Sequence, residues 1–211
     1  MKPVKWGIIS TADIGVKKVI PAMLRAKGVE IVAIASRDEA RAKEAATKLG
    51  IPKSYGSYEA LLADPEIEAV YNPLPNHLHV PVTLQALAAG KHVLCEKPIA
   101  MDAAQAGQLT EAAKKAGKLV TEAFMVRYHP QWRRARELAQ SGALGEVSLV
   151  ASVFSYYNVD PNNVRNMGDI GGGALYDIGC YPIVTSRFVF GAEPTRVTAA
   201  IDWDPTFKTD R

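Results

Sequence analysis

The chain has 211 residues, of which 48% are hydrophobic and 22% are charged, and this composition is ordinary for a globular protein. Its net charge is +3, from 25 basic and 22 acidic residues, and the basic residues are scattered over predicted helices. This pattern favours solvated helix faces over a nucleic-acid footprint, and no apolar run approaches the length of a membrane span.

The cysteines and histidines exclude two further classes of protein. Cys95 and Cys180 are too few for a disulfide framework, and the four histidines show no metal-ligand spacing. The apolar stretch at the N-terminus is too short for a signal peptide. We therefore expect reduced thiols, no bound metal, no membrane contact and a cytoplasmic protein.

Strands and helices alternate over the first 125 residues. The expected strands cover residues 4–9, 31–35, 69–71, 92–95 and 119–123. The expected helices cover residues 14–26, 36–49, 80–89 and 103–116. Pro21 should kink or restart the first helix, and Ser36 and Glu39 fit a capping box that opens the second. Because the strands are continuous apolar runs, they predict an α/β fold with a doubly wound parallel sheet covered on both faces.

The sequence pattern changes after His129-Pro130. The elements expected there are a charged helix at 131–140, an alternating strand at 146–157, a glycine-rich helix start at 171–173 and a last strand at 195–201. They predict a second unit of the α+β class with an exposed or partner-facing sheet. We place the boundary between the two domains at residues 125 and 126.

The loop after the first strand reads GIISTADIG, where a dinucleotide fingerprint has the pattern G-x-G-x-x-G. Ser10, Ala12 and Gly15 occupy the three glycine positions, so only the third glycine is kept. Serine and alanine are small enough to let the backbone approach a pyrophosphate at the helix N-terminus. A plain strand-to-helix turn is an equally good interpretation of this loop alone. The residues expected at the phosphates are Ser10, Thr11, Ala12, Asp13 and Ile14.

The end of the second strand indicates the choice of cofactor. An NAD site usually has an acidic residue there, whereas this chain has Ser36 and Arg37, with Arg41 one helical turn later. An acid would repel a 2′-phosphate, while a guanidinium pairs with it, so we expect NADP rather than NAD. The alternative is that Ser36 only caps the helix and that both arginines are surface charges.

Two other strand ends carry polar residues, and ligands of doubly wound sheets bind at the carboxyl ends of strands. Glu96 and Lys97 follow one such strand, and Pro98 biases Lys97 toward an extended conformation that aims its side chain. The segment NPLPNHLH follows the strand that ends at Tyr71. Its residues expected near the cofactor are Pro73, Leu74, Asn76 and His79.

The chain resembles the Gfo/Idh/MocA oxidoreductase family in the segments AGKHVLCEKP, PNHLH, EAFMVRYHP and GGGALYDIGCYP. The resemblance implies a dinucleotide-binding Rossmann domain over residues 1–125. It also implies a substrate or oligomerisation domain over residues 126–211, built on a large open sheet that is often used for dimer contact. Ser36-Arg37, NPLPNHLH and Tyr181 look like the branch of NADP-dependent aldose (xylose or glucose) dehydrogenases and dihydrodiol dehydrogenases.

The resemblance also implies roles for individual residues. Lys97 would lie near the reacting hydroxyl or carbonyl, and Tyr181 would transfer the proton. A free tyrosine, with a pKa of about 10, is a poor base near neutrality, and a nearby ammonium lowers that value. Asp177 would orient substrate hydroxyls or Lys97, and Glu96 would hold its motif through hydrogen bonds. The residues expected on the substrate side are Lys97, Arg127, Tyr128, Asp177 and Tyr181.

The expected activity is hydride transfer between NADP and a carbon of a sugar or cyclic polyol, which gives a lactone or a ketone. A catalytically silent dinucleotide-binding regulator or sensor is the alternative, and the presence of both Lys97 and Tyr181 argues against it. Asp177 and Tyr181 alone would also fit a capped helix start with a half-buried tyrosine. Because members of the family continue with several further strands, we expect a fragment of a longer protein that forms a homo-oligomer at full length.

Overall fold

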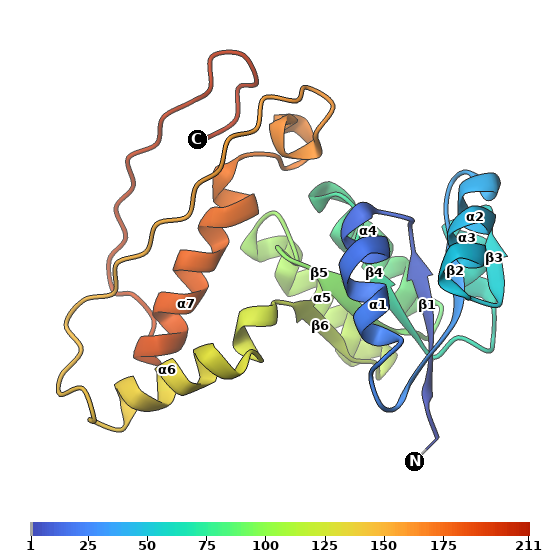
Figure 1. The fold of residues 1–211 in the computed structure, drawn as a ribbon, viewed down its shortest axis with the longest axis horizontal. Helices are drawn as coiled ribbons and strands as arrows, with labels where there is room; N and C mark the ends of the chain where they lie inside the picture. Colours follow the sequence, from blue (N-terminus) through green and yellow to red (C-terminus); the bar gives the residue numbers. More distant parts are fainter. Residues whose placement is uncertain (1) are drawn as a thin grey trace. The chain divides into compact units, whose positions relative to one another are not determined.

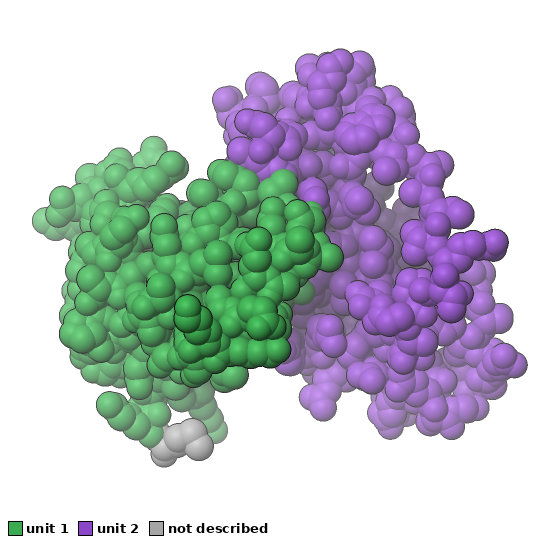
Figure 2. Space-filling view, turned by 180° about the vertical axis from the view of Figure 1, so that it is seen from behind, with its two compact units in different colours: residues 1–123 green, residues 124–211 purple. Residues whose placement is uncertain are grey.

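The computed structural model describes residues 2–211, and the chain divides into two compact units between Ala123 and Phe124 (Figure 2). The functional boundary expected at residues 125 and 126 stays a prediction. Within the described residues, no helix is both long enough and apolar enough to cross a membrane.

The first unit is built on a six-stranded parallel sheet in the order β3-β2-β1-β4-β5-β6 (Figure 1). Its strands are β1 (Val4–Ile9), β2 (Val29–Ala35), β3 (Lys53–Tyr55), β4 (Ala69–Asn72), β5 (His92–Glu96) and β6 (Val120–Ala123). Its helices are a π-helical turn (Gly15–Val19) that continues into α1 (Ile20–Met23), then α2 (Glu39–Leu49), α3 (Tyr58–Ala63), α4 (Asn76–Ala88) and α5 (Ala103–Ala116). This is the predicted doubly wound α/β fold.

Two apolar clusters hold the helices to the sheet. Ile8 of β1 packs in one cluster with Ile20 of α1, while its neighbour Ile9 packs in the other with Leu61 of α3 and Val82 of α4. Successive residues of a strand point to opposite faces, so helices on both faces explain why the strands are apolar throughout. Full burial of each of these side chains stabilises the fold by about 1.5–3 kcal/mol.

All five strands expected in the first unit are confirmed, and the helix restart at Pro21 is confirmed as a change from π-helix to α-helix. The capping box at Ser36 is wrong. The N-cap of α2 is Asp38, whose carboxylate accepts the N–H groups of Ala40 and Arg41 at 3.0 and 3.2 Å. Ser36, directly after β2, is still bonded to the neighbouring strand β3, because its N–H donates to the carbonyl of Tyr55 at 3.1 Å.

Helix α4 begins four residues before the expected start at Val80. Pro75 is its N-cap residue with φ of −58°, and Pro81 is accommodated inside the helix. The segment NPLPNHLH is therefore a short loop followed by the first turn of a helix, and both Asn76 and His79 lie on that helix.

The second unit consists mainly of two helices that pack against each other, α6 (Pro130–Gln140) and α7 (Cys180–Phe190) (Figure 1). Shorter turns are η2 (Met125–Arg127), η3 (Val164–Asn166), η4 (Gly168–Ile170) and the π-helical η5 (Leu175–Gly179), which leads directly into α7. The expected charged helix at 131–140 is confirmed.

The two strands expected in the second unit, at 146–157 and 195–201, are wrong for this structure. Both segments are irregular and almost wholly exposed, and Val153 is 95% exposed. A strand is stable only when its backbone N–H and C=O groups are paired. Neither segment has a partner strand within residues 2–211. In the second unit, the strand-like pairing of the described residues is limited to an isolated antiparallel bridge between Trp203 and Asp210.

Candidate active site

The turn after β1 has the backbone geometry of a dinucleotide loop. Ser10 lies in the left-handed region with φ of +86°. Its N–H donates to the carbonyl of Ala35 at 3.0 Å, and its Oγ accepts the N–H of Ala12 at 3.2 Å. A left-handed residue other than glycine costs about 1–2 kcal/mol. The loop therefore makes the sharp turn that the first glycine of the fingerprint normally provides.

Gly15 is the third residue of the degenerate fingerprint, and it lies buried in the helical run that follows the turn. A Cβ atom there would be 3.5 Å from Pro73 Cγ and 3.5 Å from Tyr71 Cε1. This closeness matches the packing role of the third glycine. It also places the loops after β1 and β4 next to each other, where the strand order of the sheet reverses and such folds bind their ligands.

The other expected phosphate residues lie between these two positions. Thr11 and Ala12 are half-buried, whereas Asp13 and Ile14 are exposed at the start of the helical run. The Asp13 carboxylate pairs with the ammonium of Lys17 at 2.6 Å, which offsets its negative charge beside the loop.

The end of β2 presents arginines rather than an available carboxylate. Ser36 is buried and its Oγ accepts the N–H of Asp38 at 3.2 Å. Asp38 is engaged in capping α2, and its other oxygen lies 3.6 Å from Nε of Arg41. Arg37 and Arg41 are exposed. The surface at this strand end therefore suits a phosphate better than a ribose hydroxyl pair.

The Glu-Lys-Pro turn after β5 is fixed by two carboxylates. Glu96 accepts the hydroxyl of Tyr71 at 2.6 Å through Oε1 and the N–H of Lys97 at 3.3 Å through Oε2. Glu122 of β6 accepts the N–H of Ile99 at 2.9 Å, and the peptide bond before Pro98 is cis. Burial, reinforced by the charge of Glu96, raises the pKa of Tyr71 well above its ordinary value. Tyr71 therefore stays a hydrogen-bond donor, and Glu96 holds the turn that carries Lys97.

A second buried network fixes the loop after β4. Asn72 is fully buried, and its amide donates to the carbonyl of His79 at 3.2 Å and to Oγ1 of Thr83 at 3.3 Å. Its side-chain oxygen accepts the N–H of Leu74 at 3.3 Å. His79 is only 1% exposed, and burial lowers its pKa despite its two bonds to backbone carbonyls. This loop is held by side chains that sequence reasoning did not single out, Asn72 above all.

Cys95 lies on β5 immediately before this turn and is fully buried. Burial is the main cause that raises the pKa of its thiol to about 12. The thiol is therefore a packing group of the core rather than a nucleophile.

In the second unit, Asp177 lies in a polar cluster. Its Oδ2 accepts the hydroxyl of Tyr156 at 2.5 Å and pairs with Nε of Arg165 at 2.9 Å. Burial and the bond to Asp177 raise the pKa of Tyr156 to about 12. The Asp177 side chain is 14% exposed, so its charge is largely compensated by Arg165 rather than by water.

Tyr181 lies one turn into the same helical run, at the start of α7. Its ring is half-buried between Phe124, at a centroid distance of 5.1 Å, and Phe154, at 5.8 Å. Both contacts are tilted, with interplanar angles of 60° and 49°, an arrangement that aromatic pairs favour. The two phenylalanines fix the direction of the Tyr181 ring.

The glycine run before α7 is required by its geometry. Gly173 has φ of +117°, and a Cβ atom there would lie 2.0 Å from Oδ1 of Asp210. A Cβ atom on Gly172 would lie 2.6 Å from the carbonyl oxygen of Met167. The other oxygen of Asp210 accepts the N–H of Leu175 at 2.5 Å, so this aspartate is held where the helical run begins.

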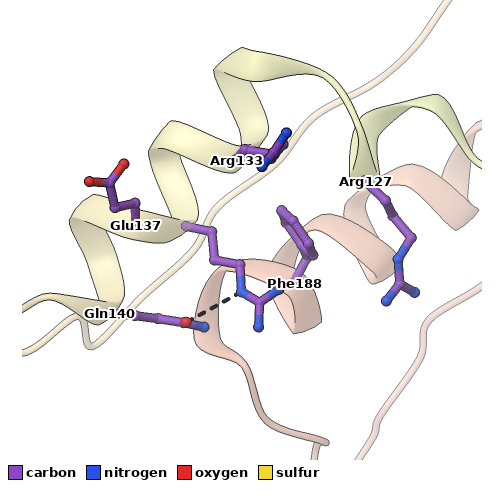
Figure 3. Close-up of a pocket in the computed structure, with 6 residues that line it drawn as sticks. Arg127, Arg133, Glu137, Gln140 and Phe188 are labelled. Carbon is purple, nitrogen blue, oxygen red and sulfur yellow. Dashed lines mark hydrogen bonds between the residues drawn. The ribbon is translucent and has the colours of Figure 1, made fainter.

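Arg127 and Tyr128, the other expected substrate residues, are exposed in and after η2. Arg127 lines an open cavity of about 270 Å³, and Figure 3 shows Arg133 on α6 and Phe188 on α7 around the same cavity. The guanidinium carbon of Arg127 is 6.0 Å from the centre of the Phe188 ring, at the limit of a cation–π contact.

The structure thus gathers the expected residues into two sets. The first unit holds the cofactor residues and Lys97 at the carboxyl ends of its strands, and the second unit holds Asp177, Tyr181 and the residues around Arg127. Sequence reasoning missed the polar partners Tyr71, Asn72 and Glu122. A tyrosine and an asparagine at the end of an apolar strand are the signal that points to the first two.

Two family models together match nearly the whole chain. The oxidoreductase family with an NAD-binding Rossmann fold, GFO_IDH_MocA, matches residues 4–124, and the GFO/IDH/MocA C-terminal domain matches residues 132–211.

The relatives of the chain are oxidoreductases, one of them uncharacterized. An uncharacterized oxidoreductase of Rhizobium meliloti, ORF334, is 55% identical over 211 residues, which are 100% of this chain and 63% of the relative. The D-xylose 1-dehydrogenase (NADP(+)) 2 of Haloferax volcanii is 48% identical over 195 residues, 92% of this chain and 59% of the relative.

A similar solved structure is KijD10, a 3-ketoreductase from Actinomadura kijaniata in complex with NADP and TDP-benzene. It has a TM-score of 0.85 and 39% identity, over 90% of this chain and 58% of that chain. The chain therefore spans about three fifths of the length of these relatives.

Proposed function

Because the chain belongs to the Gfo/Idh/MocA oxidoreductase family, we propose that it is an NADP-dependent oxidoreductase acting on a carbon of a sugar or cyclic polyol. The observation that carries the proposal is the position of Lys97. It follows β5 at the carboxyl end of the sheet, on a turn held by Glu96 and Glu122. Ligands of doubly wound sheets bind at this end.

The residues after β1 and β2 fit NADP. The left-handed turn at Ser10 and the close packing of Gly15 support a pyrophosphate at the start of the first helical run. Arg37 and Arg41 would hold the 2′-phosphate, since the nearest carboxylate, Asp38, is engaged as a helix cap. Bound NADP would supply the nicotinamide that accepts or returns the hydride.

The proton is moved by Tyr181 in this proposal. Tyr181 would take the proton of a substrate hydroxyl while a hydride leaves the carbon that bears this hydroxyl, so the alcohol becomes the carbonyl of a lactone or ketone. Asp177 would orient the substrate by accepting hydrogen bonds from its hydroxyls.

An aldose is the substrate class that we favour. The relative named as a xylose dehydrogenase is 48% identical, while the solved 3-ketoreductase is 39% identical. This difference supports oxidation at the hemiacetal carbon over reduction of a nucleotide-linked keto sugar. We also propose that the full-length protein is a homo-oligomer, and the exposed apolar side chains of residues 146–157 support a surface that is covered in the assembly.

Turnover assays test the activity and its class. The purified protein is expected to reduce NADP⁺ with D-xylose or D-glucose, followed by the absorbance of the reduced nicotinamide. Faster oxidation of NADPH with a dTDP-linked keto sugar would move the protein to the ketoreductase branch. Failure to bind NADPH at all would end the proposal.

Tyr181→Phe tests the proton transfer. It should lower kcat about 10²- to 10⁴-fold because the acid/base group is lost, with the Kd for NADPH within twofold of the parent. Tyr157→Phe is the matched control, since Tyr157 is 87% exposed on an irregular segment, and it should leave both constants unchanged. Retained turnover in the Tyr181 variant would show that another group moves the proton.

A further inference from the structure

One buried imidazole connects the two loops that face the proposed cofactor. His79, in the first turn of α4, has Nε2 2.6 Å from the carbonyl oxygen of Leu74 and Nδ1 2.7 Å from that of Pro98. Leu74 belongs to the loop after β4, and Pro98 follows Lys97 in the turn after β5. These two loops lie far apart in sequence, and His79 bridges them directly.

The backbone around His79 is itself fixed. Its carbonyl accepts the amide of Asn72, and the same asparagine accepts the N–H of Leu74. Leu74 is thus held at its N–H by Asn72 and at its carbonyl by His79. Because Asn72 and His79 are at most 1% exposed, water does not replace these bonds when one is lost.

The two bonds are chemically separable. With its pKa lowered by burial, His79 has one N–H and donates to one of the two carbonyls at a time, while the other ring nitrogen stays in short contact with the second carbonyl. An asparagine amide reaches about as far as Nδ1 of histidine, and a glutamine amide about as far as Nε2. Each amide therefore keeps one of the two contacts and removes the other.

We propose that His79 is a positioning residue that ties the loop of residues 73–76 to the Lys97-Pro98 turn. The link would fix the position of Lys97 relative to the cofactor. In this role His79 acts through the two loops, because both of its ring nitrogens face backbone carbonyls, and the direct cofactor contact expected from the sequence stays a prediction. That the two loops hold cofactor and Lys97 rests on the proposed function, whereas the mechanical link between them does not.

Two variants separate the halves of this link. His79→Gln keeps the Leu74 contact and frees the turn after β5, so kcat should fall about 5- to 10-fold with the Kd for NADPH within twofold. His79→Asn keeps the Pro98 contact and frees the loop after β4, so the Kd for NADPH should rise about 5- to 10-fold with kcat within twofold. A merely structural histidine would give the same loss in both variants.

Amide hydrogen exchange measures the link between the two loops and does not require an activity assay. His79→Gln should speed exchange at residues 97–101, and His79→Asn should speed it at residues 74–78. The matched controls are His92→Asn and His92→Gln, at the opposite end of β5, where Nδ1 of the ring accepts the N–H of Leu119 at 3.0 Å. Neither control should change either segment.

The exchange result decides the inference even if the parent binds no NADPH, in which case only the proposed function fails. Equal acceleration of both segments by both variants, or acceleration of neither, would overturn the positioning role. Thermal unfolding of each variant shows whether the fold is retained. If both His79→Gln and His79→Asn are globally unfolded at the assay temperature, this result would also count against a local link.

Discussion

Replacing Tyr71 by Phe removes a single oxygen atom from beneath the Lys97 turn. Tyr71 is fully buried, and its hydroxyl donates to Glu96 at 2.6 Å. The ring and its packing are kept, so the loss is that of a hydrogen bond to a charged acceptor, which contributes about 1.5–3 kcal/mol. We expect Tyr71→Phe to lower the free energy of unfolding by about 2 kcal/mol.

Tyr55→Phe is a matched control within the same sheet. Tyr55 also donates to a carboxylate, Oδ2 of Asp64, at 2.8 Å. Lys53 binds the same oxygen at 2.8 Å, so Asp64 keeps a charged partner when the hydroxyl is removed. We expect this control to lose only about 0.5–1 kcal/mol, the lower part of the range of an ordinary hydrogen bond.

Urea denaturation followed by far-ultraviolet circular dichroism measures both variants. At slopes of about 1–3 kcal/mol per molar urea, the Tyr71 variant should shift its midpoint by roughly 1 M. The double variant Tyr71→Phe/Glu96→Gln should lose less, because a neutral amide is easier to leave without a donor than a carboxylate. If Tyr71→Phe costs no more than Tyr55→Phe, Glu96 is not held by Tyr71 and the account of the turn is wrong.

Two further outcomes follow from charged residues. Arg37→Ala should weaken NADP by about 1.5–3 kcal/mol in titrations of cofactor fluorescence and leave NAD nearly unchanged, and equal weakening of both cofactors would refute the 2′-phosphate role. The hydrogen bond and charge of Lys53, together with hydrogen bonds from the N–H of Glu66 and the hydroxyl of Tyr55, lower the pKa of Asp64 from 3.8 to about 2. Because the folded pKa lies below the unfolded one, this carboxylate stabilises the protein above pH 3.8, and the contribution is lost as the pH falls toward 2. Asp64→Asn should therefore flatten the acid limb of the stability curve measured in urea, and an unchanged acid limb would contradict the assignment.

Local pattern was enough to predict most of the first unit, because its strands are buried on both faces and read as apolar runs. Strand β3 was missed because Lys53-Ser54-Tyr55 is short and polar, and it is recognised only by its pairing with Ala33–Ala35. The expected strand at 146–157 failed for the opposite reason. Alternation describes the two faces of a strand, but it does not supply the neighbour that pairs with its backbone.

In the candidate site, too, the residues that follow a strand along the chain were predicted, and their partners on other strands were not. Lys97 and the loop after β4 were found because each follows an apolar strand, a relation visible along the chain. The partners that hold them, Tyr71 for Glu96 and Glu122 for Ile99, come from neighbouring strands of the sheet. Such pairings depend on strand order, which one sequence does not display. Asp38 also displaced Ser36 as the helix cap because the N–H of Ser36 is still bonded to Tyr55 of β3, so that the helix begins only at Glu39.

Ser10, with φ of +86° after β1, shows that a nucleotide loop can keep its backbone conformation without the glycine of the sequence motif. Its hydroxyl holds the next turn through the N–H of Ala12 and offsets part of the conformational penalty that glycine avoids. Selection at such a position acts on a backbone torsion angle, so any residue type that can adopt this angle is allowed. Searches that require glycine there will pass over loops of this kind, whereas a search on backbone torsions would recover them.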